Sequence, residues 1–410
     1  MSSFYSKLNL RFNPFLSEEH TYPMRGREHF IQILRARLLA VLGAGAPAHF
    51  LILLGGYGLG KTFTLLTLRS KLKDPSFLDH DYKILPTLVK ALPPRPPARY
   101  AQYLLSKMFD DLKPELAELR KEIAQVGVDE ESFLNEINPS VRNAILNIAG
   151  PHENTAIEWF RCFSLRRDQQ KLINVNFNIN SDDRALEVFF EFLKTMKLLK
   201  YQALVVLVDE FENILALGGA KPDQFALSYR RFFDDAVETQ SRFKNIPSVI
   251  FVLACTPGAY EALYKYKELF RAKTSIEGGG IPALLDRIRP YEDVFNLEPF
   301  TNAQTEEFLK DRLEKARKGE SEYPLFPFET EYPSFIRSEG QGRPRLIRAH
   351  TGTIIEGAAQ ADIAPISEAD GRKILQTCGY LAMAAPTVEK VEEKPKKREI
   401  KIEELESKVE

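Results

Sequence analysis

Short apolar runs alternate with segments of helical period along the chain up to residue 300. A run that is apolar at nearly every position and only five to eight residues long is typical of a strand buried in a parallel sheet. The runs are FLILL at 50–54, YKILPTLV at 82–89, ALVVLV at 203–208, SVIFVLA at 248–254 and DVFNL at 293–297. The segments at 24–42, 61–72, 225–243 and 259–273 repeat apolar residues at helical spacing. This alternation predicts an α/β fold with a mainly parallel sheet and helices on both faces.

A long helical segment, residues 94–200, separates the second and third apolar runs. The stiff connector PPRPP stands at its start. The apolar residues beyond this connector fall on one helical face: Tyr100, Tyr103, Leu104, Met108 and Leu112. A further helix is expected from about Asp182, because Ser181 is a good N-cap. Pro86 lacks a backbone N–H, so the run at 82–89 is predicted to be an edge strand or to end there.

The pattern changes after residue 300, where strand signals stop. Thr301 and Gln304 form the spacing of a capping box, which predicts a helix start. The residues that follow, to about 383, also have helical spacing. Residues 384–410 are mostly charged and cannot bury enough apolar surface to fold alone, so a disordered tail is expected.

Composition narrows the class of protein. Of 410 residues, 44% are hydrophobic, and 56 basic residues stand against 57 acidic ones, for a net charge of −1. This balance gives no global attraction to nucleic acid or to an anionic membrane, so any contact with DNA must be a local patch. The three cysteines form no CxxC pair, and no stretch of about 18 apolar residues occurs. We therefore expect a cytoplasmic protein with no membrane contact.

The sequence GGYGLGKT at 55–62 carries the strongest chemical signal. It has the spacing Gly-x4-Gly-Lys-Thr between an expected strand and an expected helix, which is the phosphate-binding loop pattern. Such a loop points backbone N–H groups at a phosphate, its lysine bridges the β- and γ-phosphates, and its hydroxyl binds Mg²⁺. The candidate nucleotide-binding residues are Gly55, Gly56, Tyr57, Gly58, Leu59, Gly60, Lys61, Thr62 and Phe63, with Thr62 as a metal ligand. A glycine-rich structural turn is the alternative.

An apolar strand that ends in Asp209 and Glu210 can complete such a site. At the carboxyl end of its strand, Asp209 is placed to act as a second Mg²⁺ ligand, and Glu210 as the base that activates water. An apolar run ending in DE is weak evidence alone. Together with the glycine pattern it predicts ATP hydrolysis with Mg²⁺ as cofactor.

The order of these motifs resembles the AAA+ P-loop ATPases, in particular the branch of origin-recognition-type and related STAND-like signalling ATPases. The resemblance covers roughly residues 10 to 350. A looser resemblance, in the block from Asp183 to Leu215, is to the ATP-binding proteins of phage-exclusion (BREX) systems. The AAA+ resemblance implies an N-terminal segment lining the nucleotide site at 1–47, an ATPase core at 48–300 with a helical insertion at about 94–200, and a helical lid at 301–383. It also implies a homo-oligomer.

By the same resemblance, Thr256 in VLACTP is a polar sensor at the end of the strand next to the DE strand. The segment LLDRIRP corresponds to the family's arginine finger, with Arg287 as first choice and Arg289 as second. Such an arginine stabilises charge on the phosphoryl group in the neighbouring subunit's site. The alternatives are a threonine that satisfies local backbone and an arginine that pairs with nearby acids on the surface.

The sequence GRPR at 342–345 resembles the second sensor of the family, an arginine at the start of a lid helix that contacts the γ-phosphate. Arg345 is the better candidate, because Pro344 suits the first turn of a helix, and Arg343 is the alternative. The sequence MRGRE at 24–28 resembles the family's N-terminal box beside the adenine base.

The insertion offers a candidate surface for a partner. Trp159 and Phe160 lie close in sequence to the basic residues Arg161, Arg166, Arg167 and Lys171. Aromatic and basic residues together can stack bases and hold phosphates, whereas a lone tryptophan more often packs in a core. Both interpretations stay open at this point.

Two functions fit these residues. The first is an ATPase whose client is DNA or a DNA-processing protein, in replication, mobile-element or anti-phage work. The second is a nucleotide-gated scaffold that times protein assembly and touches no DNA.

Overall fold

The computed structural model describes residues 4–16, 25–78, 82–92, 99–124, 135–148, 150–217, 221–242, 246–273, 279–321 and 323–380. The described chain divides into two compact units. The helical unit holds residues up to 33, together with 55–67 and those from 296 onward, and the sheet unit holds 34–54 and 68–295. The expected tail at 384–410 and the PPRPP connector lie outside the described residues.

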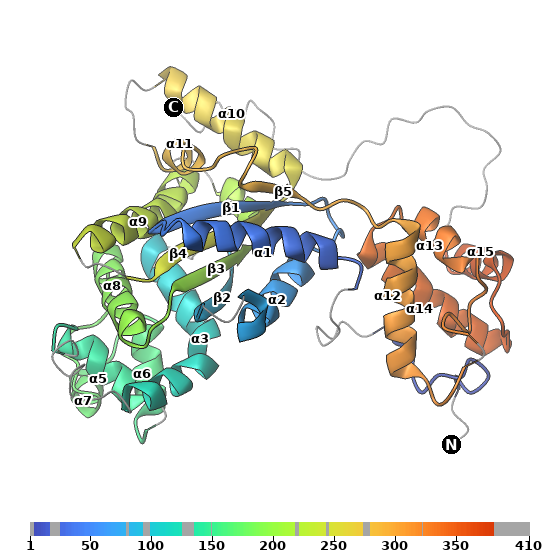
Figure 1. The fold of residues 1–410 in the computed structure, drawn as a ribbon, viewed down its shortest axis with the longest axis horizontal. Coiled ribbons are helices and arrows are strands. Elements are labelled where there is room, and N and C mark those ends of the chain that lie inside the picture. The colour runs from blue at the N-terminus through green and yellow to red at the C-terminus, as the bar shows by residue number, and fades with distance from the viewer. Residues whose placement is uncertain are drawn as a thin grey trace. The chain divides into compact units, whose positions relative to one another are not determined.

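Five strands form the sheet of Figure 1 in the order β2-β3-β4-β1-β5. They are β1 (Ala48–Leu54), β2 (Ile84–Lys90), β3 (Ala203–Asp209), β4 (Ser248–Cys255) and β5 (Val294–Asn296). The pairs β1–β4, β3–β4 and β2–β3 are all parallel. β3 and β4 are buried at every position, as their continuous apolar sequences predict. β2 is an edge strand, which confirms the placement expected from Pro86.

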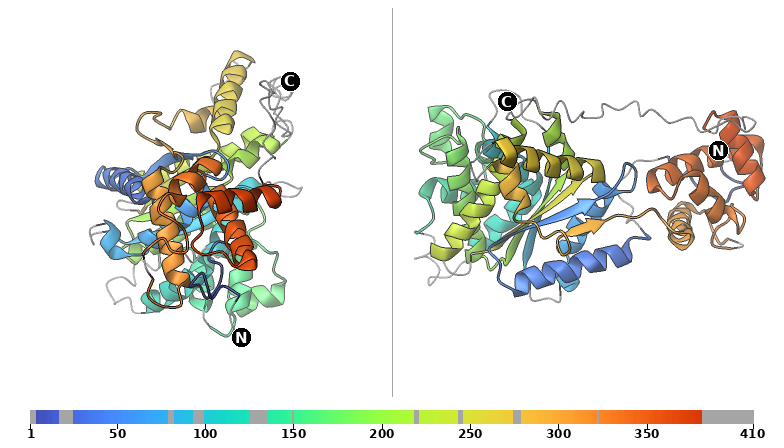
Figure 2. Two further views of the ribbon diagram at one scale, coloured as in Figure 1. Left: turned by 90° about the vertical axis from the view of Figure 1, so that its right-hand side faces the viewer. Right: turned by 90° about the horizontal axis from the view of Figure 1, so that it is seen from above.

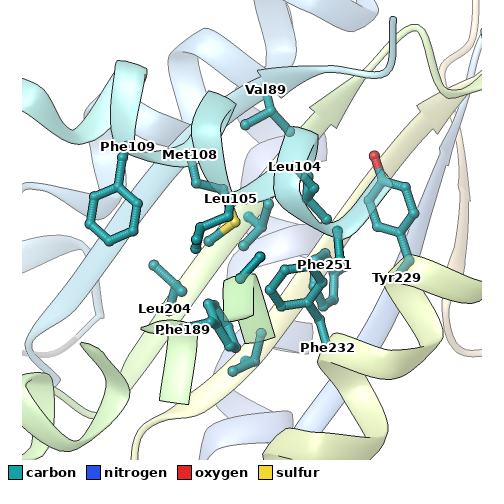
Figure 3. Packing of buried hydrophobic residues seen from close by; sticks show 14 of the residues in the cluster. Val89, Leu104, Leu105, Met108, Phe109, Phe189, Leu204, Tyr229, Phe232 and Phe251 are labelled. Carbon is teal, nitrogen blue, oxygen red and sulfur yellow. The ribbon is translucent and has the colours of Figure 1, made fainter. Parts of the chain in front are cut away.

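Side chains alternate between the two faces of the sheet. On one face, Phe50, Leu204 and Phe251 pack in a core with helices α3 (Tyr100–Ala124), α8 (Asp182–Leu198) and α9 (Lys221–Arg242), as Figure 3 shows for part of this cluster. Leu51, Val205 and Val252 on the other face are buried as well. Helix α1 (Glu28–Gly43) lies on the opposite side of the sheet from α9 (Figure 2). Helices therefore cover both faces, as predicted.

The segment expected as an insertion, at about 94–200, packs as part of this core. Its first and last helices, α3 and α8, pack against each other over the sheet, and Ser181 caps α8 by accepting a hydrogen bond from the backbone N–H of Arg184. The short helices α5 (Pro139–Asn147), α6 (Glu153–Phe160) and α7 (Arg167–Leu172) lie between them in the chain. Trp159 and Phe160 are fully buried, and the Trp159 indole donates to the Phe177 carbonyl at 2.7 Å. These two rings form core, so the hypothesis that they stack bases was wrong.

The sheet unit contains several further elements: η1 (Pro75–Leu78), η2 (Phe211–Ala216), α10 (Pro257–Lys273) and α11 (Gly280–Leu285). Helix α2 (Lys61–Leu72) begins at the lysine of the glycine pattern. Among the described residues, no helix is long and apolar enough to span a bilayer.

The helical unit has its own core. It is built from α12 (Asn302–Ala316), α13 (Tyr332–Glu339), α14 (Pro344–Ala361) and α15 (Glu368–Thr377). The capping box of Thr301 and Gln304 is present at the start of α12, as predicted. Residues 4–16 pack into the same core through Leu8, Leu10 and Phe15. The first residues of the chain thus complete the C-terminal helical unit, a contact that the sequence pattern did not indicate.

Candidate nucleotide site

The glycine loop, Gly55–Gly60, follows β1 directly and precedes α2. Gly58 and Gly60 have φ angles of 79° and 93°, in the left-handed region that side chains disfavour. A Cβ at Gly55 would lie 3.1 Å from the Lys61 side chain and 3.2 Å from Leu297. The loop is therefore narrow, and its conformation requires glycine at the positions where the pattern has it.

Lys61 begins α2 and folds back over the loop. Its ammonium donates to the Gly55 carbonyl at 2.8 Å and lies 5.4 Å from the centre of the Tyr57 ring. The residue is 9% exposed. Thr62 and Phe63 occupy the same first turn, and Phe63 packs against the core of the helical unit. A buried cation at the start of a helix, where N–H groups also point outward, favours an anion at this position.

Arg27 supports the loop from the N-terminal segment. It is 4% exposed, donates from Nη2 to the Leu59 carbonyl at 3.1 Å, and lies 4.7 Å from the centre of the Phe300 ring. Burial lowers the pKa of Arg27 to about 10, and the charge of Glu298 opposes this shift. The guanidinium is still protonated at neutral pH. Its buried Nε atom has no hydrogen-bond acceptor among the described residues, which fits a site built for an anionic ligand.

Helix α14 brings two more arginines to the loop. The Arg345 backbone N–H donates to the Gly58 carbonyl at 3.2 Å. A Cβ added at Gly58 would lie 3.3 Å from the Arg345 Cβ and 3.8 Å from that of Arg343. Both arginines are exposed, and in the described chain neither guanidinium makes an ion pair or hydrogen bond. Within the helical unit, the buried guanidinium of Arg27 and the backbone positions of two exposed arginines thus adjoin the glycine loop.

In the sheet unit, the carboxyl ends of the strands meet at one edge. Leu54 of β1 pairs with Cys255 of β4, and Val208 of β3 pairs with Leu253 of β4. Because all three strands are parallel, the residues that follow them leave the sheet at the same edge. Asp209 ends β3 and Glu210 follows it. Thr256 follows β4, and the glycine loop follows β1 in the chain.

Asp209 and Glu210 differ sharply in exposure. Asp209 is 1% exposed, and its carboxylate accepts a hydrogen bond from the Glu210 backbone N–H at 2.9 Å. Glu210 has a φ angle of 55°, unusual for a residue with a side chain, and its carboxylate is 43% exposed. It accepts from the Asn213 amide at 3.2 Å and lies 3.7 Å from the Lys90 ammonium. The arrangement leaves Glu210 as an oriented carboxylate that water can reach.

Thr256 lies between β4 and α10. Its hydroxyl accepts a hydrogen bond from the Ala259 backbone N–H at 3.3 Å, and its carbonyl accepts from Tyr260 at 3.0 Å. This is the geometry of an N-cap, so the threonine satisfies local backbone, the alternative weighed from the sequence. The hydroxyl hydrogen remains available as a donor, and a sensor role stays a prediction.

The two candidate finger arginines lie in different surroundings. Arg287 is 25% exposed, bonds to Asp234 at 2.5 Å and to the Ala283 carbonyl at 2.6 Å, and stacks on Phe233. Arg289 is 56% exposed and pairs with Glu292 at 2.7 Å. A group that acts on a neighbouring molecule must be accessible. These contacts favour Arg289 over Arg287 for that role.

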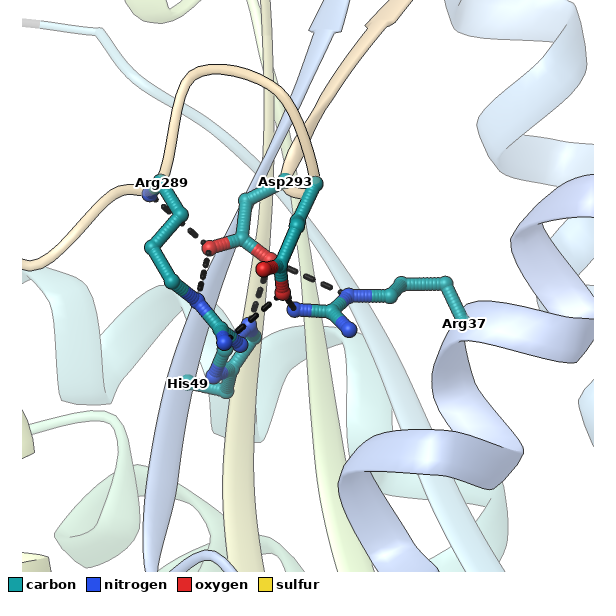
Figure 4. Close-up of polar contacts among 5 residues, drawn as sticks. Arg37, His49, Arg289 and Asp293 are labelled. Atoms are coloured by element: carbon teal, nitrogen blue, oxygen red, sulfur yellow. Dashed lines mark hydrogen bonds and ion pairs between the residues drawn. The ribbon is translucent and has the colours of Figure 1, made fainter.

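Asp293 anchors the arginine segment to the rest of the sheet unit (Figure 4). Its carboxylate is fully buried and receives hydrogen bonds from Arg37 at 2.6 Å, from the Arg289 backbone at 2.9 Å, and from His49 at 2.8 Å. Burial alone would raise the pKa of Asp293, but the hydrogen bonds from His49, the Arg289 backbone and Arg37 together hold it below its usual value. The segment carrying Arg287 and Arg289 is therefore held firmly at β1 and α1.

The expected Mg²⁺ ligands are compatible with that ion. Thr62 offers a hydroxyl and Asp209 a carboxylate, both hard oxygen donors of the kind that Mg²⁺ prefers. In the described parts of the chain, no group of three or more histidine, cysteine, aspartate or glutamate side chains is arranged to hold a metal ion alone. A bound Mg²⁺ would complete its shell with phosphate oxygens and water, as is usual for this ion in nucleotide sites.

Comparison with solved structures supports the fold. The ORC2 protein of Aeropyrum pernix, in ADPNP–ADP complexes, aligns over 93% of this chain and 74% of its own, with a TM-score of 0.53 and 14% identity. The ADP form of the same protein aligns over 90% of this chain and 73% of its own, with a TM-score of 0.50 and 14% identity. No protein-family model and no curated protein matches the sequence. The chain thus shares the fold of the ORC2 protein, and the resemblances to AAA+ ATPases and to phage-exclusion ATPases stay predictions.

The sequence found most of these residues but not all. The glycine loop, the strand-end acids and both arginine pairs were predicted from motifs. Arg27 was included only within the MRGRE segment, and its contact with Leu59 was not foreseen. Its signal was weak because one arginine in a charged segment looks like ordinary surface. Asp293 was not singled out, because an acid four residues after Arg289 looks in sequence like a local ion pair.

Proposed function

We propose that this protein binds and hydrolyses ATP with Mg²⁺, and that its nucleotide state controls a DNA-linked process. Lys61 and the backbone N–H groups of the glycine loop hold the phosphates. Arg345 contacts the γ-phosphate, with Arg343 as the alternative. The positive groups around the loop match the negative charge of a nucleoside triphosphate.

The observation that carries the proposal is the convergence of Lys61, Arg27, Arg343 and Arg345 on one glycine loop. A buried guanidinium without a full set of acceptors costs free energy. Among the described residues, no carboxylate pairs with Arg343 or Arg345. A polyphosphate supplies the missing acceptors. The ORC2 structures with the same fold contain ADPNP and ADP, which agrees with this assignment.

Hydrolysis rests on the strand edge of the sheet unit. Mg²⁺, when bound, neutralises charge that develops on the phosphates. Thr62 and Asp209 hold the ion, and Glu210 takes the proton of the attacking water. Thr256 orients the reacting group from the neighbouring strand. The exposure of the Glu210 carboxylate supports this role, because a base must be accessible to the attacking water.

The molecule is proposed to act as a homo-oligomer. An arginine from one subunit then stabilises the transferred phosphoryl group in the next. Arg289 is the better candidate on exposure, and Arg287 the alternative from the motif. The DNA-linked role is supported by the resemblance of the motifs to origin-recognition-type ATPases and by the fold shared with the ORC2 protein.

Equilibrium binding of a fluorescent ATP analogue to the wild type and Lys61→Ala tests the nucleotide site. Loss of a charged hydrogen-bonding group predicts a roughly 10- to 100-fold weaker affinity. Lys71→Ala, an exposed lysine on the same helix α2, is the control and should bind as the wild type does. Equal affinity in all three proteins contradicts the proposal.

The DNA-linked role is tested by ATP turnover at fixed salt with and without DNA. Stimulation or inhibition by DNA supports it. Turnover that DNA leaves unchanged supports the nucleotide-gated scaffold instead.

A further inference from the structure

The turn between α6 and α7 presents one aromatic ring to solvent. Phe163 is 52% exposed, although its neighbours Trp159 and Phe160 are fully buried. A single exposed apolar residue is common and proves nothing alone. The backbone geometry and the positive charge of the segment distinguish Phe163 from an ordinary exposed residue.

The backbone of the turn holds Phe163 in a fixed position. The Phe163 N–H donates to the Glu158 carbonyl at 3.0 Å, and the Cys162 N–H donates to the Trp159 carbonyl at 2.9 Å. These two bonds form a Schellman motif at the end of α6. Cys162 takes the left-handed position, with a φ angle of 62°, where glycine is usual. Phe163 is thus displayed by a turn that is rigid and locally strained.

Further hydrogen bonds hold the residues that follow Phe163 in the chain. Leu165 exchanges two hydrogen bonds with the Asn178 side chain, its N–H donating at 2.9 Å and its carbonyl accepting at 3.0 Å. The Trp159 indole N–H donates a hydrogen bond to the Phe177 carbonyl. Phe163 therefore belongs to a segment that hydrogen bonds hold on both sides, and its exposure does not come from a loose loop.

The charge of this segment is strongly positive. Residues 161–180 contain four basic side chains and one acidic one, in a chain whose net charge is −1. Arg161 pairs with Asp110 and lies 5.1 Å from the centre of the Phe163 ring, while Arg166 pairs with Asp168 at 3.3 Å. Arg167 and Lys171 are exposed and have no ion pair in the described chain. They are four residues apart on α7, so they lie on one face.

We propose that this surface, which comprises Phe163, Arg167 and Lys171, binds single-stranded DNA. An aromatic face accepts a base only when that base is free to leave its own stack, which an unpaired strand allows. Arg167 and Lys171 contact the phosphates on either side. An apolar protein partner would require an apolar groove, whereas here the exposed ring lies beside Arg161 in a segment with four basic residues and one acidic residue. The inference deepens the proposed function, because it names the surface that meets the DNA client.

Fluorescence anisotropy with the full chain and a labelled single strand of about 16 nucleotides tests this surface. Phe163→Ala should weaken binding by about 5- to 100-fold, the usual effect of removing one stacking ring. Phe163→Trp keeps the stacking face and should bind as well as the wild type. Tyr380→Ala is a matched control, because Tyr380 is also 52% exposed but lies in the helical unit. Its binding should not change.

The salt dependence tests the basic residues separately. Removing two phosphate contacts from a single strand lowers the slope of log affinity against log salt by about 1.4. The double variant Arg167→Ala with Lys171→Ala should show this change. An unchanged slope contradicts the proposed phosphate contacts.

The outcomes separate this inference from the proposed function. If wild type does not bind the single strand, if it prefers a duplex or RNA of the same sequence, or if Phe163→Ala binds normally, the inference is wrong. Phe163→Ala should still bind the ATP analogue normally, since Phe163 is not part of the nucleotide site. If Lys61→Ala binds the analogue normally and DNA binding still depends on Phe163, the nucleotide assignment fails and the inference stands.

Discussion

One buried carboxylate, Asp293, shows how single residues position the candidate site. A buried charge is tolerated only when it is paired and hydrogen-bonded, and Asp293 has Arg37, His49 and the Arg289 backbone as partners. These contacts come from α1, β1 and the arginine segment. The orientation of Arg289 therefore depends on a buried acid, whereas Arg287 is held by Asp234 and the Ala283 carbonyl.

Asp293→Asn should lower the free energy of unfolding by about 3 kcal/mol at pH 7, because it removes the buried carboxylate charge to which the partly buried Arg37 and His49 are hydrogen-bonded. The pKa of Asp293 is lower in the folded state, so its stabilising contribution is fully present above the ordinary value of 3.8 and is lost as pH falls through the folded pKa. Urea unfolding at pH 7 and in steps below pH 4 measures the difference.

Glu292→Gln is the control for that substitution. Glu292 is 50% exposed and pairs with the same arginines, Arg37 and Arg289. As an exposed ion pair it should contribute less than about 1 kcal/mol. Equal destabilisation by the two substitutions contradicts the account of Asp293.

At the scale of elements, the sequence predicted what local pattern determines. All five strands and the caps of α8 and α12 were found, because apolar period and capping residues are local signals. The exposure of individual aromatic rings was not found. Trp159, Phe160 and Phe163 look alike in sequence, and only the turn at Cys162 decides that the third ring points outward.

Gly342 tests whether the start of α14 is held against the rest of the helical unit. It has a φ angle of 63°, and a Cβ there would lie 2.8 Å from the Phe300 carbonyl oxygen. Gly342→Ala should lower the free energy of unfolding by about 2 kcal/mol or more, from strain and overlap together. It should also weaken ATP binding, because Arg343 and Arg345 follow directly. Gly319→Ala, with open space around its Cβ, is the control.

Thermal unfolding and ATP-analogue titration measure both effects of Gly342→Ala. A variant as stable as Gly319→Ala, with normal affinity, contradicts the proposed coupling of this turn to Arg343 and Arg345.

At the scale of the whole molecule, the described chain has two cores, and residues far apart in sequence share one of them. Phe15 packs with Phe308, and Arg312 donates to the Pro14 carbonyl at 2.8 Å. About 300 residues separate these partners in the chain. No local pattern reveals such a contact, so the packing of residues 4–16 against α12 could not be predicted from the sequence.

Phe15→Ala should cost about 3 to 5 kcal/mol of stability in the helical unit, the usual effect of removing a buried ring. Phe12→Ala is the control, because Phe12 is 40% exposed against 2% for Phe15. Hydrogen exchange of α12 and α14 distinguishes the two. Equal protection in both variants means that residues 4–16 add nothing to this core.

The most direct test of the central claim is steady-state ATP turnover by the wild type and Glu210→Gln at matched concentrations. The substitution keeps the size of the side chain and removes the base, so turnover should fall by about 10²- to 10⁴-fold while ATP-analogue binding is retained. Glu118→Gln, an exposed acid on α3, should turn over ATP normally. Equal turnover in the wild type and Glu210→Gln would contradict the assignment of this protein as an ATPase with Glu210 as its base.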